Sequence, residues 1–557
     1  MCGILALINA QEGNVDKVRH HLSLLNHRGP DSSGITHWKF MGTSNYLGHT
    51  RLAIVDPESG AQPFETEKGT LLAVNGEIYN WGQIKSLYKT EHRTKSDCEC
   101  IAHLLDNCDD EMPYEKICCM INGVYAFVCM NGKTTEIWAA RDPLGVVPLY
   151  YGYKSNGTMA FASEMKALNG LVDVISEFPP GHYYVSSEGF KKFYHPSWKI
   201  TMPPPSAAAY PEWIQKGRKS GIRRTLEKAV KRRMMADVPW GVLLSGGLDS
   251  SIVAALASKI QHEWDYRPPI DTFAIGLEGS PDLEAAELVA KHIGTNHRSY
   301  TFTVEEALSA IPEVIRHLET YDVTTIRAGV PMYLLARKIK ATGVKMVLSG
   351  EGADEIYGGY MYFHNAPNWE EFFQETQRKI FDLHYYDCLR ANKAMAAWGV
   401  ECRVPFLDMD HLEHAMKLDP ILKMPMHQST GMEKHILRET FSDLLPKEIC
   451  WRQKEQFSDG VGYKWIDSIK EMAECSIHLR VWKQRSRMFP MHTPKTHEAL
   501  YYRMYYEKYF PIPAAYSLVP YGKSCACSSD TAARWKGNEK DDASGRSVKN
   551  HIKSVVK

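Results

Sequence analysis

The chain has 557 residues, of which 44% are hydrophobic and 24% are charged, a composition typical of a globular protein large enough for two domains. Lysine plus arginine and aspartate plus glutamate each number 66, so the sequence lacks the excess of positive charge that holds phosphate backbones. These values argue against nucleic acid and anionic membranes as partners, and they favour small-molecule chemistry.

The first ten residues, MCGILALINA, contain a short apolar run from Ile4 to Ile8. No basic residue precedes the run and no small-x-small cleavage site follows it, so we expect a buried strand rather than a secretory signal. The 13 cysteines include no spaced C-x-x-C pair, which indicates reduced thiols. No run approaches the ~20 apolar residues of a membrane span. We therefore expect a cytosolic protein.

Removal of Met1 would give Cys2 a free α-amine in addition to its thiol. Its α-amine, with an unperturbed pKa of ~7.7 to 8, could then accept the proton of its own thiol and activate the sulfur for attack on a carbonyl. One residue would supply both nucleophile and base.

Short β-type runs, such as GTLLAVNGEIYN and TTEIWAARD, alternate with Gly, Asn, Asp and Ser clusters through about residue 190. This pattern predicts an antiparallel two-sheet domain with a few helices. The proline-rich segment 196–212 cannot enter a helix interior or a regular ladder, and we place the domain boundary there.

After this boundary, long helical patterns alternate with the brief apolar runs GVLL, DTFAIGL and KMVLS. The alternation predicts a parallel sheet with helices on both faces, followed by a mostly helical extension beyond residue 360. From residue 523 the sequence becomes polar and poor in large apolar residues, which favours a flexible tail. We expect domains at 2–200 and 210–522 and a tail at 523–557.

Two strand-to-loop junctions in the second domain carry the features of a phosphate site. After Gly241 to Leu244, the loop SGGLDS places two glycines and two hydroxyls before a helix, an arrangement that can hold pyrophosphate. The loop lacks the G-K-[ST] ending of a Walker A motif, and a plain glycine turn is the alternative. The second junction, KMVLSGEGADE, adds carboxylates suited to Mg²⁺, although Glu355 could simply cap a helix.

These loops resemble the pyrophosphate loop region of the ATP pyrophosphatase superfamily. The N-terminal fragments HRGPD, HTRLAIVD, VNGEIYN and SDCE resemble class II amidotransferases. With ETYDVTTIRA, RANKAMAAWGVECRVPFLD and WRQKEQFSDGVGYKWID, the chain resembles the glutamine-hydrolysing asparagine synthetase family over essentially its whole length.

The resemblance implies a fold and a reaction. The fold is α/β plus α+β: an N-terminal antiparallel two-sheet sandwich of the αββα N-terminal-nucleophile type, and a C-terminal doubly wound parallel-sheet synthetase domain with a helical extension. The reaction hydrolyses glutamine at Cys2 and passes the ammonia to a β-aspartyl-adenylate made from ATP and L-aspartate. Mg²⁺ as cofactor and a homodimeric assembly are also implied.

The resemblance also assigns residues to the two sites. The glutaminase site comprises Cys2 as nucleophile, Asn75 and Gly76 as oxyanion donors, and Arg51, Leu52, Ala53, Ile54, Val55, Glu77 and Asp97 as further glutamine-binding residues. ATP is held by Leu243, Ser245, Gly246, Gly247, Leu248, Asp249, Ser250, Ile275, Ser349 and Gly350. Glu351 and Lys454 are catalytic, Thr324, Thr325 and Arg327 bind aspartate, and Asp249 and Asp354 are the Mg²⁺ candidates.

Several of these residues have ordinary structural alternatives. Asn-Gly is the commonest hairpin turn dipeptide. Arg51 and Arg327 could form structural ion pairs, and Lys454 could be a solvated surface lysine. Because all the fragments occur together in the family's order, the functional interpretation is favoured.

Two other functions remain open from the sequence. The same machinery could use a different acceptor, as in the β-lactam synthetase relatives, and aspartate would then fail to stimulate pyrophosphate release. A catalytically silent homologue could act as a sensor or scaffold, although retention of Cys2, Asn75, Asp249 and Asp354 counts against it.

Overall fold

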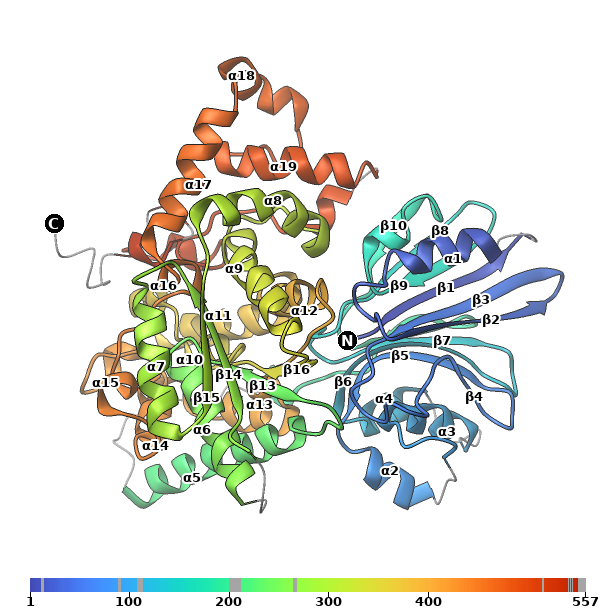
Figure 1. Cartoon of the computed structure of the whole chain (residues 1–557), viewed down its shortest axis with the longest axis horizontal. Helices are drawn as coiled ribbons and strands as arrows, with labels where there is room; N and C mark the ends of the chain where they lie inside the picture. The colour runs from blue at the N-terminus through green and yellow to red at the C-terminus, as the bar shows by residue number, and fades with distance from the viewer. Residues whose placement is uncertain are drawn as a thin grey trace.

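The structure is a computed structural model of the whole chain. It describes residues 1–548 except 12–14, 89–91, 108–113, 200–211, 264–267, 513–514, 539, 541 and 543. Two bodies of structure lie side by side and meet at the start of the chain (Figure 1). Most of the predicted boundary segment 196–212 lies outside the described residues.

Two antiparallel sheets of six strands each stack face to face in the N-terminal domain (Figure 1). The first has the order β10-β8-β9-β1-β3-β2, with β1 (Gly3–Ala10), β2 (Ser32–Phe40), β3 (Thr43–Arg51), β8 (Tyr150–Tyr153), β9 (Met159–Ala162) and β10 (Val174–Glu177). The second has the order β12-β11-β7-β6-β5-β4, with β4 (Phe64–Glu65), β5 (Leu71–Ile78), β6 (Gly123–Met130), β7 (Ile137–Arg141), β11 (His182–Val185) and β12 (Gly189–Lys192).

Strand periodicity explains the layers of this domain, because successive side chains point to opposite faces. On β1, Ile4 faces the core between the sheets, whereas Leu5 packs with Leu22 of α1 (Val15–Ser23). On β5, Ala73 faces the same inter-sheet core and Val74 faces the outer helices α2 (Trp81–Tyr88), α3 (Cys100–Asp106) and α4 (Tyr114–Met120). The predicted αββα sandwich is confirmed.

Five parallel strands form the sheet of the C-terminal domain, in the order β15-β14-β13-β16-β17. They are β13 (Trp240–Leu243), β14 (Asp271–Gly276), β15 (Asn296–Thr301), β16 (Met346–Leu348) and β17 (Glu401–Arg403). Val242 packs into the cluster that contains α6 (Leu248–His262) and α7 (Pro281–Ile293), whereas Val347 packs with α8 (Val304–Leu318) and α9 (Val323–Lys340). Helices therefore cover both faces, and the predicted doubly wound domain is confirmed.

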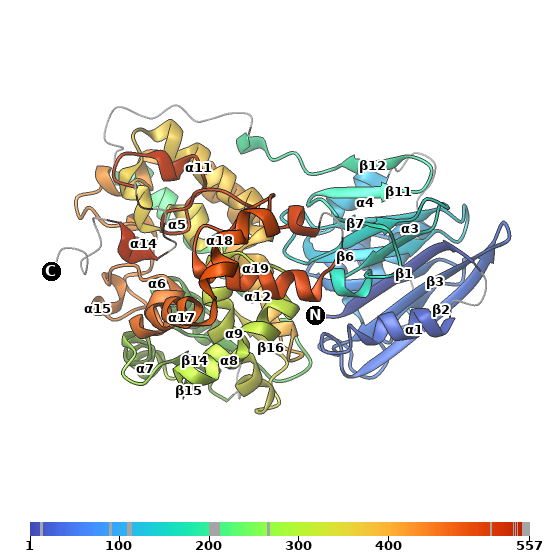
Figure 2. The same cartoon turned by 90° about the horizontal axis from the view of Figure 1, so that it is seen from above.

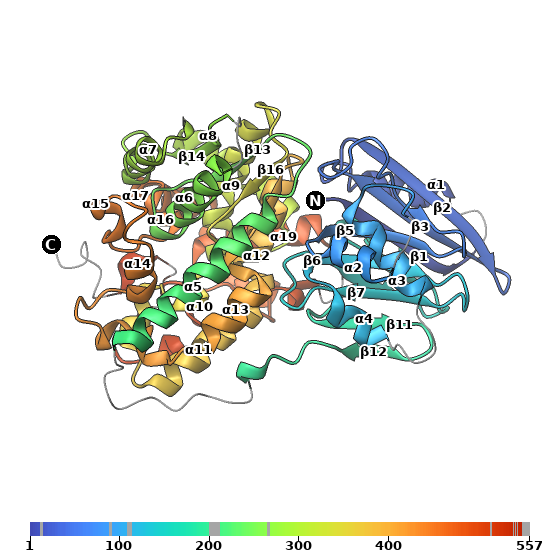
Figure 3. The same ribbon diagram turned by 90° about the horizontal axis from the view of Figure 1, so that it is seen from below.

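The remaining helices surround this sheet. Helix α5 (Glu212–Arg233) runs beside α13 (Met409–Met416) and α14 (His435–Phe441) (Figure 3), whereas α17 (Tyr463–Ser476), α18 (Leu479–Met488) and α19 (His497–Tyr509) form the helical extension over α8 and α9 (Figure 2). The others are α10 (Ala353–Tyr357), α11 (Trp369–Asp382), α12 (Asp387–Ala396), α15 (Lys447–Cys450) and α16 (Phe457–Gly460).

The expected flexible tail differs from the structure in its described part. Cys525, Ala532, Trp535 and Val548 are buried in one cluster with Tyr362 and other aromatic side chains. The described part of the tail is packed because its few apolar residues find an aromatic surface on a distant part of the chain, which composition cannot reveal. Residues 549–557 lie outside the described part.

Candidate active sites

Cys2 lies immediately before β1, where the two domains meet. Its backbone N–H donates to Asn75 Oδ1 at 2.8 Å, and the Leu52 N–H donates to Cys2 Sγ at 3.4 Å. Burial raises the pKa of the Cys2 thiol, while the nearby α-ammonium and the Leu52 N–H act in the opposite direction. Because this chain carries Met1, cleavage of one peptide bond would move the α-amine onto Cys2 itself.

The Asn75-Gly76 pair lies within β5 and not in a hairpin turn, since both residues pair with β6. Asn75 is fully buried, and its Nδ2 donor has no hydrogen-bond partner among the described residues. Gly76 has a φ of 149°, and a Cβ there would lie 2.1 Å from Val124 O, so only glycine fits. A buried amide donor without a partner, on the side chain that holds the Cys2 N–H, suits an oxyanion site.

Residues 52–55 follow β3, and the first of them, Leu52, contacts Cys2. Leu52, Ala53 and Ile54 are buried, and the Ala53 N–H donates to Asp31 Oδ2 at 2.8 Å. The Arg51 guanidinium donates to the carbonyl oxygens of Val55 at 3.2 Å and Pro57 at 3.2 Å, and also to that of Asp56. Arg51 thus shapes this loop through carbonyl contacts.

Two predicted glutamine-binding acids, Glu77 and Asp97, are buried in the same region. Asp97 Oδ2 accepts from the Ile78 N–H at 2.7 Å, and burial raises the pKa of Asp97 to about 6. Burial also raises the pKa of Glu77, although the Arg403 guanidinium lies 2.9 Å from its Oε1. A bound ammonium group would favour the charged form of both acids.

A buried ionic network links this site to the synthetase sheet. The Met1 ammonium contacts Glu401 Oε2 at 2.7 Å, and Arg403 Nε donates to Glu401 Oε1 at 2.6 Å. Since Arg403 also pairs with Glu77, β17 supplies charged side chains to the glutaminase site. Sequence reasoning missed Glu401 and Arg403, because nothing in VECRVPF marks contact with a domain some 300 residues earlier.

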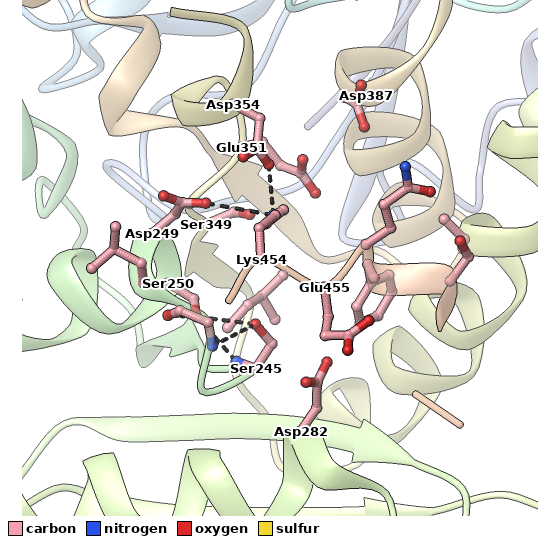
Figure 4. Close-up of a pocket in the computed structure, with 18 of the residues that line it drawn as sticks. Ser245, Asp249, Ser250, Asp282, Ser349, Glu351, Asp354, Asp387, Lys454 and Glu455 are labelled. Carbon is pink, nitrogen blue, oxygen red and sulfur yellow. Dashed lines mark hydrogen bonds and ion pairs between the residues drawn. The ribbon is translucent and has the colours of Figure 1, made fainter. Parts of the chain in front are cut away.

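The loop SGGLDS joins β13 to α6 and lines a cavity in the C-terminal domain (Figure 4). Ser250 Oγ accepts from the Ser245 N–H at 3.2 Å and donates to Gly247 O at 3.1 Å, so the loop closes on itself. Gly246 has a φ of 73°, the left-handed region that favours glycine. A Cβ on Gly350 would lie 2.7 Å from Ser250 N, so Gly350 allows the two predicted phosphate loops to touch.

Paired carboxylates and two lysines line this cavity. Figure 4 shows Lys454 beside Asp249 and Asp354. Lys454 Nζ contacts Asp354 Oδ2 at 2.6 Å, and Lys434 Nζ contacts Asp354 Oδ1 at 2.6 Å and Asp249 Oδ2 at 2.7 Å. Burial lowers the pKa of Lys454, but the adjacent carboxylates outweigh it and raise that pKa overall. Lys454 is therefore a cavity lysine, not a solvated one. Lys434 was missed, because GMEKHILRE offers no sequence signal for it.

Leu243, Ile275 and Ser349, for which ATP contacts are predicted, also line this cavity, and so does Glu351. Glu351 Oε1 accepts from Arg390 at 2.8 Å; burial raises the pKa of Glu351, and the guanidinium acts against this. Arg390 belongs to α12, and the sequence did not suggest it as a site residue.

The three predicted aspartate-binding residues, Thr324, Thr325 and Arg327, lie on α9, and all of them line a second cavity that adjoins the first. Thr324 lines both cavities, and the buried Thr325 hydroxyl donates to Asp322 Oδ2 at 2.7 Å as part of the helix cap. Arg327 forms a two-point ion pair with Glu498, with Nε to Oε1 at 2.8 Å and Nη2 to Oε2 at 2.6 Å. The structural ion pair that the sequence left open for Arg327 is therefore present.

A second cavity of about 710 Å³ adjoins the first. Thr324, Asp387, Arg390 and Cys527 line both cavities, so the two spaces meet at these side chains. Its other walls come from α11, from the helical extension and from residues 520–530.

Family comparisons cover most of the chain. A glutamine amidotransferase domain model matches residues 1–193, and an asparagine synthase model matches residues 221–517. The chain is 47% identical to the asparagine synthetase (glutamine-hydrolysing) of Zea mays over 99% of this chain and 94% of that protein. Asparagine synthetases 1 and 3 of Arabidopsis thaliana are 46% and 48% identical, each across 98% of this chain and 94% of the relative.

Among solved structures, the glutamine phosphoribosylpyrophosphate amidotransferase of B. subtilis, complexed with ADP and GMP, matches 54% of this chain and 81% of its own. Its identity is 19% and its TM-score 0.30.

This fold and these two sites define a class of protein in which a glutamine amidotransferase domain is joined to an ATP-dependent synthetase domain. Near-full-length similarity narrows the assignment. The chain belongs to the glutamine-hydrolysing asparagine synthetase family. In the described part of the chain, no helix has both the length and the apolar character needed to cross a bilayer.

Proposed function

We propose that the chain makes L-asparagine from L-aspartate and ATP with ammonia taken from L-glutamine, releasing glutamate, AMP and pyrophosphate. The observation that carries this proposal is the presence of both sites in one chain. Cys2 lies beside the Asn75 donor, which has no partner among the described residues, and Lys454 lies beside the carboxylates of Asp354 and Asp249. Near-full-length similarity to named synthetases supports the same reaction.

At the first site, the Cys2 thiolate would attack the side-chain amide carbon of glutamine. Asn75 Nδ2 would donate to the oxygen that becomes negative, and Asp97 would pair with the α-ammonium of the substrate. Collapse of the tetrahedral intermediate breaks the carbon–nitrogen bond, releases ammonia and leaves a thioester. Water then hydrolyses the thioester to glutamate and restores the thiol.

At the second site, a β-carboxylate oxygen of aspartate would attack the α-phosphorus of ATP, and pyrophosphate would leave. The SGGLDS loop would hold the pyrophosphate through backbone N–H groups, and Lys454 would neutralise its growing charge. Ammonia then attacks the acyl carbon and AMP leaves. Glu351 and Arg390, which are hydrogen-bonded to each other, would orient the acceptor.

Asp249 and Asp354 suit a Mg²⁺ ion that is shared with ATP. Both carboxylates face one point, since Lys434 contacts both. The described residues contain no cluster of three or more acidic, His or Cys side chains placed to hold a metal alone. This donor set fits Mg²⁺ held by one or two carboxylates plus substrate phosphates. When bound, the ion would neutralise phosphate charge. We further propose a homodimer that works in the cytosol, to be tested by sedimentation and by cell imaging.

Purified protein with ATP, Mg²⁺, aspartate and glutamine tests the proposed reaction. We expect asparagine and equal AMP. Cys2→Ala should abolish glutamine-dependent synthesis and keep ammonia-dependent synthesis, because only the first site uses the thiol. Asp249→Asn should do the reverse, removing synthesis and keeping glutaminase activity. Loss of both activities in folded Cys2→Ala protein would contradict this division of labour, and pyrophosphate release that ignores aspartate would point to another acceptor.

A further inference from the structure

The C-terminal segment, residues 523–548, takes no part in the reaction as derived so far, yet it lies against the synthetase site. Lys523, Ser528 and Ser529 line the second cavity, and Cys527 lines both cavities at the point where they meet. The segment therefore supplies one wall of the space next to Glu351 and Arg390.

Specific contacts to buried polar groups hold the segment in place. The Ser529 hydroxyl donates to Glu375 Oε2 at 2.6 Å, and the Cys527 carbonyl accepts from Lys379 Nζ at 3.0 Å. Further along, Ser544 Oγ donates to Asp459 Oδ1 at 2.7 Å. Glu375 and Asp459 are fully buried, and the segment supplies hydrogen-bond donors to both of these carboxylates.

Asp542 holds the segment against α9, the helix that carries the predicted aspartate-binding residues. Its Oδ1 lies 3.4 Å from Arg327 Nη1, and its Oδ2 accepts from Lys470 Nζ at 2.9 Å. Arg327 is buried and already paired with Glu498. The Arg327 guanidinium is therefore paired with carboxylates of the protein. Arg390, in contrast, lines both cavities at the place where they meet.

The second cavity has the chemistry of an entrance for an acidic amino acid. Lysine and arginine side chains, among them Lys379, Lys495 and Arg390, share its walls with carboxylates such as Asp322 and Asp387. A substrate with two carboxylates and one ammonium group can pair with both signs. ATP, in contrast, would occupy the first cavity beside the SGGLDS loop.

We propose that the C-terminal segment is a wall of the acceptor site, which holds aspartate near Glu351 and shields the acyl-adenylate from water, with Asp542 as its anchor. The proposal rests on the proposed function of the synthetase domain. Without the wall, water would attack the acyl carbon, the bond to AMP would break, and aspartate plus AMP would form. ATP would then be consumed without product.

The test compares the full chain with a chain that ends at Gly522 and with Asp542→Asn, Asp542→Glu and Lys536→Ala. Lys536 is exposed within the same segment and serves as the matched control. For each protein, the KM values for aspartate, ATP and glutamine and the ratio of AMP to asparagine are measured. Thermal unfolding and glutaminase activity report folding.

We expect the truncated chain to raise the KM for aspartate by at least about tenfold and to form more AMP than asparagine, while the KM for glutamine stays within about twofold. Asp542→Asn should change the same two quantities by about two- to fivefold, Asp542→Glu should restore them in part, and Lys536→Ala should change neither. If the truncated chain fails to fold, Asp542→Asn decides the matter.

The proposal would be overturned if Asp542→Asn changed neither the KM for aspartate nor the ratio of AMP to asparagine. It would also be overturned if the truncated chain had a lower KM for aspartate, because the segment would then block the site. In either case the full chain would still make asparagine, so the proposed function would stand. If the full chain forms no AMP with aspartate, both proposals fail.

Discussion

At the scale of single residues, the glutaminase site depends on the two ends of one amide group. Asn75 Oδ1 orients the backbone of the nucleophile, and Asn75 Nδ2 is left without a partner among the described residues. Leaving a buried donor unpaired costs about 1–3 kcal/mol. In the proposed mechanism this donor would meet the negative oxygen of the tetrahedral intermediate, which would be electrostatic preorganisation.

Asn75→Ala should therefore lower the kcat of glutamine-dependent synthesis by about 10²–10³, because one oxyanion donor is lost. Ammonia-dependent synthesis should be unaffected. Steady-state kinetics with each nitrogen donor measure both. Asn107→Ala, at the exposed end of α3, is the control. A similar loss with both donors would mean that the substitution damages the fold.

The pKa of Asp97 leads to a prediction on pH. Burial raises this pKa to about 6, so below that pH Asp97 is protonated and cannot pair with an ammonium group. The kcat/KM for glutamine should fall as the pH drops through about 6, since this ratio reports the free enzyme. Glu77, whose pKa burial also raises, would steepen the fall.

A pH series of glutaminase kcat/KM measures this effect, with Asp97→Asn as the comparison. The variant should be weak at every pH and should lose the acid limb. An acid limb of unchanged midpoint in Asp97→Asn would assign the titration to another group.

At the scale of elements, the synthetase site is made by strand ends and by the glycines that let loops touch. Parallel strands β13, β14 and β16 end at one edge of the sheet, which brings SGGLDS and SGEG together. Gly350 lies where the second loop crosses the backbone of the first, with no room for a side chain.

Gly350→Ala should raise the KM for ATP by at least about tenfold, because a Cβ 2.7 Å from Ser250 N must push the two loops apart. Glutaminase activity should stay normal. ATP-dependent pyrophosphate release measures the change. Gly82→Ala, where a Cβ meets nothing within 4 Å, is the matched control. An ATP KM that is equal in both variants would refute the close-approach argument.

At the scale of the whole molecule, the two domains share a buried ionic network. Glu401 holds the α-ammonium of the chain and Arg403, and Arg403 holds Glu77. Removing one member of a buried pair leaves the other charge unpaired, at a cost of about 3–5 kcal/mol. The position of Cys2 therefore depends on the synthetase domain.

Glu401→Gln should lower glutaminase kcat/KM by at least about tenfold, because Arg403, which also pairs with Glu77, loses its counter-charge. Ammonia-dependent synthesis should persist, because Glu401 lies outside the cavity that ATP would occupy. Both rates are measured beside Glu188→Gln, an exposed control. Equal loss of both activities would show that Glu401 supports the synthetase sheet and not the nucleophile.

The sequence by itself determined the fold class of the two halves. The alternation of short β-type runs predicted the two-sheet fold, the alternation of strands with helices predicted the doubly wound fold, and glycine spacing predicted the SGGLDS loop. The αββα type and the site roles of Cys2 and Asn75 came from the family resemblance, and those roles stay predictions. Composition alone did not indicate that the C-terminal segment packs against the synthetase domain. A few apolar residues are enough for such packing when they contact an aromatic surface.

Only the tertiary structure decided which residues meet across long distances. Lys434 carries no motif of its own, Arg390 begins a family fragment that gave it no site role, and Glu401 reaches the region of Cys2 from another domain. The pairing of Arg327 with Glu498 was likewise decided by helix packing. Charge pairing between distant segments leaves no periodicity in a sequence, since it depends on where folding places each side chain.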